Sequence, residues 1–474
     1  MFNTLLTSTI TNVFYICHRM KQVVTFAAIF LLLSSCKQNE KDNGTFFGGE
    51  ILNPKSDHVL LMQQNEVLDT IFLDQKNVFG KTFYDLKPGL YSFKHGNEFQ
   101  YIYLEPKDSI NVRLNTWDFD ESLVFDGKGS EKSEFLLDLF LNNEREYWNY
   151  YSYYKLPEKE FNGKFNSSLN RNISQFKKFA QSNPQLSTDF LHLAEGASTF
   201  TLYSMKELYP MVYNRHYKTA DSLVLSPEYY NYRDNINLND EILADYYAYQ
   251  NYLSAHIYND VISKNNFDIS EENLKQQVLQ SIVENVNIES LKNSLLYQEI
   301  SKLIFNPNSN INPAFLNIFY ENCTDDDLVK NIKETLRLKE TIENYDLIKD
   351  IKFVDRQDKI KTLDQLIGGN PALVLFSKQH DLSNEALDKR LDYLSKKFPD
   401  VIIVNLHFDT GDTEISYHNT SNFNYKLIDP KSISSYVSDK FPRSLIINKK
   451  GEIINNFSLL YDYSLEKELK KLLD

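Results

Sequence analysis

Cysteine is scarce in this sequence, and its spacing excludes several kinds of chemistry. The 474 residues contain three cysteines, Cys17, Cys36 and Cys323, and no C-x-x-C motif. Because disulfide exchange within one chain needs an attacking thiolate and a second thiol that resolves the mixed disulfide, no dithiol redox centre is predicted. The histidines and cysteines also lack the spacing of zinc ligands, and no His-Glu-x-x-His motif occurs. We therefore expect no metal site and no cofactor.

Long basic runs, phosphate-binding glycine loops and internal repeats are missing as well. The formal net charge is −14, with 51 Lys and Arg against 65 Asp and Glu. Nucleic acid is therefore not expected as a partner, because phosphate binding needs a basic surface. No nucleophile turn or repeat period stands out. The composition, 42% hydrophobic and 24% charged, is that of a globular protein, and the length suggests about two to four domains.

The first 36 residues have the pattern of an export signal. Lys21 precedes an apolar run, 23–33, and two small residues, Ser34 and Ser35, stand directly before Cys36. A basic start, a short apolar core and small residues before the cleavage point are typical of a signal peptide, and the run is too short for a membrane span. The segment resembles a bacterial lipobox, which implies that Cys36 is lipidated and becomes the first mature residue. A plain secretory signal with an incidental cysteine is the alternative.

This pattern divides the N-terminal region into two segments. We predict that residues 1–35 are a leader and signal peptide, with Met20 as its natural start, and that residues 36–44 are a polar, flexible tether. Lys37, not Asp, follows the cysteine, which favours attachment to the outer membrane. The expected location is the cell envelope, with the membrane as a partner through the lipid anchor. Whether the protein faces the periplasm or the exterior is left open.

Short strands separated by turns are predicted over residues 45–129. Residues 110–114, Ile-Asn-Val-Arg-Leu, alternate apolar and polar side chains, as a half-buried strand does. Pro88 and Gly89 are typical of a turn. Several short strands at close spacing indicate a β-sandwich domain. The expected strands are 59–62, 68–73, 78–83, 91–93, 101–104, 110–114 and 123–125.

Residues 130–345 are predicted to form an irregular α-helical domain. Five apolar or aromatic residues share one face of its first helix: Leu136, Leu139, Phe140, Tyr147 and Tyr151. Prolines at positions 157, 184, 210, 227, 307 and 313 are expected to break helices. The further helices are expected at 174–180, 189–203, 241–262, 271–286, 291–304, 314–320 and 328–345.

Residues 346–474 have an α/β pattern. An apolar run, 372–376, predicts a buried strand, and a helix follows it after a short loop. The helix has one apolar face at helical spacing: Leu387, Leu391, Leu394 and Phe398. Ser383 fits its N-cap, and Leu382 can pack against the first of these leucines.

The order of these elements resembles the TlpA/ResA-like periplasmic thioredoxins. Residues 353–369 are similar to the hairpin, Leu-x-x-Leu step and glycine that come before the first core strand of that family. A second apolar strand, 401–408, follows, and the segment 436–453 is similar to the family's cis-proline loop and hairpin. A final helix is expected at 464–473. The resemblance implies a C-terminal α/β thioredoxin-like domain over about a quarter of the chain, the usual size of one small domain.

Two further expectations rest on this resemblance. It implies a cis peptide bond between Phe441 and Pro442, with Arg443 beside the loop after the first core strand. The cis-proline loop would then expose a backbone edge that can pair with an extended peptide. The segment 45–129 resembles the β-domain that often precedes thioredoxin domains in lipoproteins.

The sequence departs from the family where the family carries its C-x-x-C motif. Asp381, Leu382, Ser383 and Asn384 stand there instead. Asp, Ser and Asn suit the start of a helix but cannot exchange disulfides. We therefore predict a degenerate active site, in which the fold is kept, the chemistry is lost and no residue is catalytic.

Other chemically interesting residues each have a structural alternative that we prefer. The aromatic cluster 147–154 can stack on sugars or bind a protein partner. The preferred interpretation is that its rings lie in the core of a helix packing and that their hydroxyl groups reach solvent. The same interpretation applies to the tyrosines of 245–252. His380 and Asp381 can act as an acid–base pair, but a solvated loop is preferred. His407 is predicted to be a partly buried structural histidine, and Cys323 a buried lone thiol.

Two classes of function remain open, with a third behind them. The first is a non-catalytic lipoprotein whose thioredoxin-like domain binds a protein or peptide. The second is a redox protein of the thiol–disulfide oxidoreductase class that works with the thiols of a partner. The third is a glycan-handling lipoprotein that uses its aromatic side chains. The cysteine count favours the first.

Overall fold

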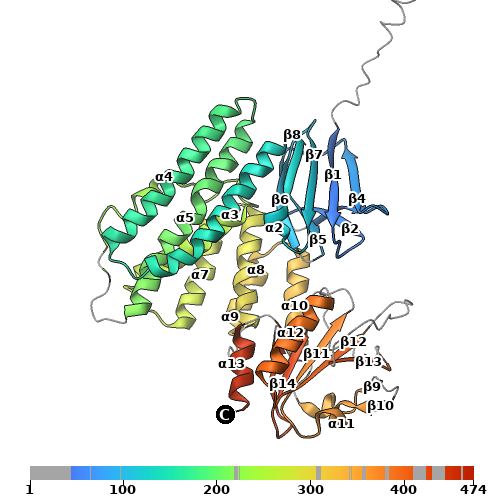
Figure 1. The fold of residues 1–474 in the computed structure, drawn as a ribbon. Helices are drawn as coiled ribbons and strands as arrows, with labels where there is room; N and C mark the ends of the chain where they lie inside the picture. The colour runs from blue at the N-terminus through green and yellow to red at the C-terminus, as the bar shows by residue number, and fades with distance from the viewer. Residues whose placement is uncertain are drawn as a thin grey trace, which may run out of the picture.

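A computed structural model describes residues 44–473 apart from 65, 97, 218–222, 224, 306–310, 341, 343, 355–358, 379–383, 409–422, 430–442, 459 and 461–462. The described chain is multidomain, with two sheets near its start, a helical region, and a third sheet near its end (Figure 1). Cys36, the predicted signal peptide and the tether as far as residue 43 lie outside the described residues. The domain bounds themselves stay predictions.

The N-terminal strands form two four-stranded sheets. The strand order is β4-β1-β7-β8 in one sheet and β3-β2-β5-β6 in the other. Phe47, Phe93 and Phe125 lie in the apolar core between them. A short helix, α2 (Phe119–Ser122), precedes the last strand. The strand bounds are β1 Thr45–Leu52, β2 His58–Gln63, β3 Glu66–Phe72, β4 Val78–Phe83, β5 Gly89–His95, β6 Glu98–Leu104, β7 Ser109–Asn115 and β8 Val124–Lys128.

β1 is the strand that the sequence did not predict. It contains Gly48 and Gly49, and glycine is depleted in strands. A Cβ on Gly48 would lie 2.6 Å from the carbonyl oxygen of Phe79, and a Cβ on Gly49 would lie 2.0 Å from that of Val112. The two glycines therefore allow β1 to approach both antiparallel β4 and parallel β7 closely.

The sandwich leads into the helical region through Gly129. This residue has φ 91°, and a Cβ there would lie 2.2 Å from Oδ1 of Asp108, so only glycine fits. Lys132 follows in the first turn of the next helix and is 2% exposed. Its Nζ donates to Oε2 of Glu105 and to Oδ2 of Asp108, both at 2.7 Å. One buried ammonium thus joins the first long helix to the turn between β6 and β7.

Helices make up most of residues 130–340. Their main apolar core begins at Leu90 and Tyr103 of the sandwich and continues through the helices as far as Ile332. A second core, rich in aromatic rings, includes Tyr150 and Phe161. The helix bounds are α3 Ser130–Tyr153, α4 Glu158–Ser182, α5 Thr188–Tyr217, α6 Tyr247–Lys264, α7 Glu271–Asn285, α8 Glu289–Phe305, α9 Pro313–Asn322 and α10 Asp326–Glu340.

Four predictions for this region are wrong. α6 begins at Tyr247 and not at position 241. α5 continues through Pro210 to Tyr217, although proline was expected to break the helix. Pro210 is buried, and Val212 and Tyr213 beyond it are partly buried against the aromatic core, so this packing outweighs one lost backbone hydrogen bond. α4 begins at Glu158, well before position 174, because the narrow stripe of Phe161 and Phe165 is enough to bury one face of a polar helix. α10 ends at Glu340, before position 345.

The C-terminal sheet has the strand order β10-β9-β13-β12-β11-β14-β15. β11, β12 and β13 are parallel, whereas β9 and β14 run antiparallel to their neighbours. Separate apolar clusters cover the two faces of β11. The bounds are β9 Lys352–Val354, β10 Ile360–Thr362, α11 Leu363–Ile367, β11 Ala372–Lys378, α12 Asn384–Lys397, β12 Ile402–Phe408, β13 Asn424–Leu427, β14 Arg443–Ile447, β15 Ile453–Ser458 and α13 Tyr463–Lys471.

This sheet follows the element order that the sequence predicted, with β13 as an addition. An opening hairpin, a core strand, a helix, a second strand, a closing hairpin and a final helix occur in turn. The predicted face of α12, from Leu387 to Phe398, is buried. Thr362 and Gln365 form a capping box that fixes the start of α11.

The C-terminal sheet touches the helical region through β15. Nδ2 of Asn456 donates to the carbonyl oxygen of Ile342 at 3.2 Å, and the rings of Phe305 and Phe457 stack at 5.5 Å. In Figure 1, α8 and α10 lie between this sheet and the rest of the molecule. Among the described residues, the helices are all too short or too polar to span a membrane.

Candidate functional site

The site expected from the sequence lies at the carboxyl end of β11, and most of it falls outside the described residues. Asp381, Leu382 and Ser383 are among the residues that are not described, and so are Phe441 and Pro442. Asn384 is the first residue of α12, as expected for a residue at the helix start. The cis peptide bond and the peptide-binding edge therefore stay predictions.

Arg443 is the described member of the predicted proline loop, and the structure places it in the sheet interior. It is the first residue of β14 and pairs with Phe376 of β11. It is 1% exposed, and its Nε donates to the carbonyl oxygen of Asn456 at 2.8 Å. Its guanidinium also lies over the ring of Phe457 at 5.7 Å. The side chain thus helps to fix β14 against β15 close to the carboxyl end of β11.

Two buried polar residues form a pair on the neighbouring parallel strands β11 and β12. Oγ of Ser377 donates to Oδ1 of Asn405 at 2.8 Å, and both residues are buried. A serine becomes a nucleophile when a neighbouring base accepts its proton, and an amide oxygen is not such a base. This pair therefore joins β11 to β12. The side chain of His407, which follows on β12, is outside the described side chains.

Cys323 is the one cysteine among the residues that the structure describes. It belongs to a different apolar core from that of the C-terminal sheet. It caps the end of α9 and belongs to the apolar core of the helical region. It is 8% exposed, and its Sγ lies 3.9 Å from the carbonyl oxygen of Asp325. Burial raises the pKa of the thiol above its ordinary value. The prediction of a buried lone thiol is confirmed.

The aromatic cluster 147–154 is divided between core and surface. Tyr150 and Tyr154 are buried in the aromatic core, as predicted. Tyr147, Trp148 and Tyr151 are 47%, 74% and 58% exposed, so the core interpretation is wrong for these three. Their rings touch one another, with centroids 5.9–6.4 Å apart. We call these three residues the aromatic surface of α3.

The change of face on α3 has a packing cause. Asn143 is buried where its side chain meets Thr201 and Asn172 of neighbouring helices, and Tyr150 lies two turns further along that same stripe. Trp148 lies on the far side of the helix from this stripe, and Tyr147 and Tyr151 lie at the exposed edge of the stripe. The tyrosines of 245–252 follow the prediction more closely, since Tyr246, Tyr249 and Tyr252 are buried.

Sequence reasoning missed a buried polar cluster around Glu207 on α5. This carboxylate is 0% exposed and accepts hydrogen bonds from four side chains: Tyr232, Arg233, His256 and Asn259. The neighbouring Lys206 has its Nζ over three rings at 4.6–4.8 Å: Phe165, Tyr229 and Tyr232. Burial lowers the pKa of Lys206 to about 8.

The only sequence signal for this cluster is a pair of opposite charges inside an otherwise apolar stretch of α5, between Met205 and Leu208. The cluster joins α5, α6 and the 3-10 helix Asn231–Asn235. Four side chains donate to the one carboxylate of Glu207, which is typical of a structural network. Within the described ranges, His, Cys, Asp and Glu side chains do not gather into a group that could hold a metal ion.

Comparison with known proteins gives matches to solved structures only. No protein-family model matches the sequence, and no curated protein does. A crystal structure and a solution structure of a proposed thiol-disulfide oxidoreductase from Bacteroides vulgatus are each 15% identical to this chain. They cover 26% and 29% of this chain and 90% and 92% of their own chains, with TM-scores of 0.21 and 0.22.

A further match is the crystal structure of Trgpx in its apo form. It is 12% identical, covers 28% of this chain and 97% of its own, and has a TM-score of 0.21. These likenesses extend over a small part of the chain, and at such TM-scores they carry no argument about activity. The chain is thus similar over about a quarter of its length to structures that include proposed thiol-disulfide oxidoreductases.

Proposed function

We propose that this protein is a lipid-anchored envelope protein that binds a protein or peptide partner and does not exchange disulfides. In this proposal the C-terminal α/β sheet is a thioredoxin-like domain of the TlpA/ResA-like type, with Asp381 to Asn384 in place of the redox cysteines. Its anchor is Cys36, and its location is the outer membrane. The observation that carries the non-redox part is the position of Cys323.

The cysteines decide what disulfide chemistry is available to the chain. Residues 346–474 contain no cysteine, and Cys323 is the only one after Cys36. Cys323 is buried in the helical core, and burial raises the pKa of its thiol. A reactive cysteine needs an accessible thiolate, and a dithiol cycle needs a second thiol. Both requirements argue for binding over catalysis.

The purified protein is expected to reduce insulin no faster than the buffer background. Cys323→Ser is expected to leave that rate unchanged, because the buried thiol takes no part in exchange. The measurement is insulin turbidity in the presence of dithiothreitol, with a thioredoxin as the positive control. Reduction well above background that disappears in Cys323→Ser would establish the alternative, a thiol–disulfide oxidoreductase that works with thiols of a partner.

The aromatic surface of α3 supports the binding part of the proposal. Trp and Tyr are enriched at protein interfaces and often carry much of the binding energy there. Three such rings stand together on one helix face, and Trp148 is 74% exposed. The same rings can stack on sugars, so a glycan partner is the second candidate. A test at position 148 separates the two.

A photoreactive amino acid at position 148 is expected to crosslink the anchored protein to a protein partner in native membranes. The same substitution at Trp117, the other tryptophan of the chain, is the matched control, because it is 71% exposed but lies on the sandwich. A protease-sensitive adduct at 148 and none at 117 is the expected result, read by mass spectrometry. An adduct that glycosidases remove would favour the glycan candidate, and equal adducts at both positions would contradict a specific surface.

Cys36→Ala is expected to move the protein from the membrane fraction to the soluble fraction. The physical reason is that acyl chains on this residue supply the membrane affinity, at about 0.8 kcal/mol for each buried methylene. The measurement is fractionation together with incorporation of a labelled fatty acid. Cys17→Ala is the matched control and is expected to change neither. Unchanged membrane association of Cys36→Ala would overturn the anchor.

A further inference from the structure

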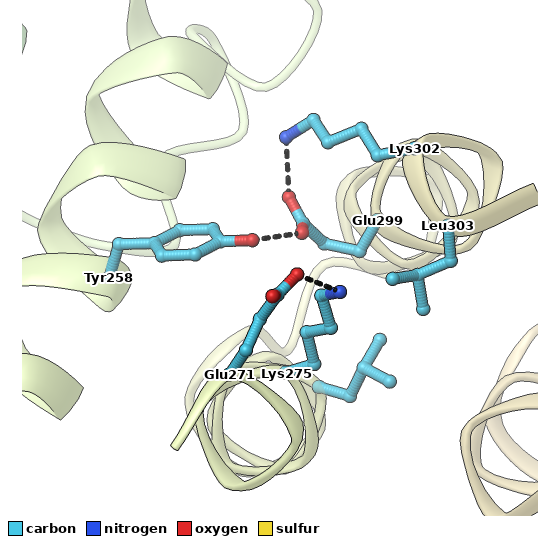
Figure 2. Close-up of a pocket in the computed structure, with 7 residues that line it drawn as sticks. Tyr258, Glu271, Lys275, Glu299, Lys302 and Leu303 are labelled. Carbon is cyan, nitrogen blue, oxygen red and sulfur yellow. Dashed lines mark hydrogen bonds and ion pairs between the residues drawn. The ribbon is translucent and has the colours of Figure 1, made fainter. Parts of the chain in front are cut away.

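A pocket between α6, α7 and α8 has a lining that suits a small ligand with two opposite charges. Its volume is about 200 Å³. Tyr258 from α6, Glu271 and Lys275 from α7, and Glu299 and Lys302 from α8 form its polar part, as Figure 2 shows. Two leucines, Leu279 and Leu303, complete the lining.

Hydrogen bonds hold the side chain of Glu299 in place within the pocket. It is 7% exposed, and both of its carboxylate oxygens are engaged. Oε2 accepts a hydrogen bond from the hydroxyl of Tyr258, and Oε1 accepts one from Nζ of Lys302, both at 2.6 Å. Two partners on different helices therefore hold this carboxylate in one orientation.

Glu271 and Lys275 form the more exposed side of the pocket. Nζ of Lys275 donates to Oε1 of Glu271 at 2.5 Å, and the Glu271 side chain is 76% exposed. Ion pairs of this kind along an exposed helix are weak. Figure 2 shows the carboxylates of Glu271 and Glu299 facing one another. A cation placed between the two carboxylates would be attracted to both.

The charges of the pocket sum to zero, with two carboxylates and two ammonium groups. A ligand with one charge that bonds to a glutamate or a lysine of the pocket displaces the partner of that residue and leaves the partner without a counter-charge. A ligand with both an ammonium group and a carboxylate supplies a counter-charge to the glutamates and to the lysines together. Leu279 and Leu303 are the apolar residues of the lining, and both are largely buried. The volume is below the range of about 300–1,000 Å³ for drug-sized ligands, so the ligand is small.

From this lining we infer that the pocket between α6, α7 and α8 binds a free α-amino acid with an aliphatic side chain. The amino group of the ligand lies between Glu271 and Glu299, its carboxylate accepts hydrogen bonds from Lys275 and Lys302, and its side chain packs on the two leucines. The pocket is a ligand site separate from the partner-binding surface of α3.

The test is calorimetric titration of the whole protein with L-leucine, isoamylamine and 4-methylpentanoate. The last two have the same side chain, but each lacks one of the two charges. L-leucine is expected to bind saturably, and each analogue is expected to bind at least about tenfold more weakly, because one charged hydrogen-bonding group is missing. Absence of saturable binding at up to about 10 mM L-leucine, or equal binding of either analogue, would overturn the inference.

Four variants link the binding to the pocket. Glu271→Gln and Lys302→Gln alter exposed pocket residues and are expected to weaken L-leucine binding about tenfold each. Glu284→Gln on α7 and Lys292→Gln on α8 change the same residue types outside the pocket and are expected to have no effect. Thermal unfolding of all four variants checks that they fold. Folded pocket variants that bind as tightly as the wild type would show that L-leucine binds elsewhere and would contradict the proposal.

Discussion

Replacing Glu207 with alanine is expected to lower the free energy of unfolding by about 3–5 kcal/mol, because the change removes a fully buried carboxylate and leaves the partly buried Arg233 without its counter-charge. The carboxylate is 0% exposed, and Nε of Arg233 donates to its Oε1 at 2.8 Å. Asn259 on α6 donates to its Oε2 at 2.6 Å. The substitution thus removes the common acceptor of α5, α6 and the 3-10 helix between them. The measurement is the urea midpoint followed by circular dichroism at neutral pH.

Two matched variants separate the buried charge from a general effect of substitution on α5. Glu195→Ala changes an exposed glutamate of the same helix and is expected to alter the free energy of unfolding by no more than about 0.5 kcal/mol. Glu207→Gln keeps the shape of the side chain and some acceptor capacity, so an intermediate loss is expected. If Glu207→Ala unfolds at the same urea concentration as Glu195→Ala, the cluster contributes little to stability.

The same cluster predicts a loss of stability in acid. Burial acts to raise the pKa of Glu207, but hydrogen bonds from His256 and Arg233, together with their charges, lower it to about 2. In the unfolded chain the carboxyl titrates near its ordinary pKa of 4.5. The stabilising contribution is therefore complete above pH 4.5 and is lost as the pH falls toward 2. Glu207→Gln is expected to lack this part of the acid sensitivity when urea midpoints are compared across that range.

The strands and helices that the sequence predicted well are those with a strong hydrophobic period. Ile110, Val112 and Leu114 alternate with polar residues, and β7 lies where they indicate. The elements that were missed lack that signal for identifiable reasons. β1 contains two glycines whose role becomes visible only from the close approach of its two neighbouring strands. α5 continues past Pro210 because Val212 and Tyr213 still pack against the aromatic core, although its fully buried residues end at the proline. Both outcomes depend on contacts between residues far apart in the sequence.

Site residues were harder to predict than elements, because a site depends on which side chains the fold brings together. The burial of Cys323 was predicted from the general tendency of lone cysteines to behave as small hydrophobic residues. The cluster around Glu207 brings together residues from positions 207 to 259, and no local sequence motif predicts it. Tyr258 and Glu299 meet in the pocket although 41 positions separate them. Helical spacing shows which residues share one face of a helix, but packing against other elements decides which face is buried.

Replacing Lys132 with methionine is expected to lower the free energy of unfolding by about 3–5 kcal/mol, because it leaves the buried carboxylate of Asp108 without a cation. The Lys132 side chain is 2% exposed and that of Asp108 8% exposed, and their charged atoms lie 2.7 Å apart. Burial raises the pKa of Asp108, and Lys132 opposes this shift. The urea midpoint at neutral pH is the measurement. Lys128→Met, an exposed lysine four positions earlier, is expected to have an effect of no more than about 0.5 kcal/mol.

A second substitution tests whether the lost charge pair is the cause. The double variant Lys132→Met with Asp108→Asn removes both charges and keeps a polar side chain that can accept a hydrogen bond from the backbone N–H of Glu105, as Oδ2 of Asp108 does at 2.7 Å. It is expected to be more stable than Lys132→Met alone, since no buried charge is left unpaired. A double variant that loses the sum of the two single effects would instead indicate that the methylene groups of Lys132 stabilise this junction through packing. The comparison therefore measures how far one ion pair, and not apolar contact, fixes α3 to the sandwich.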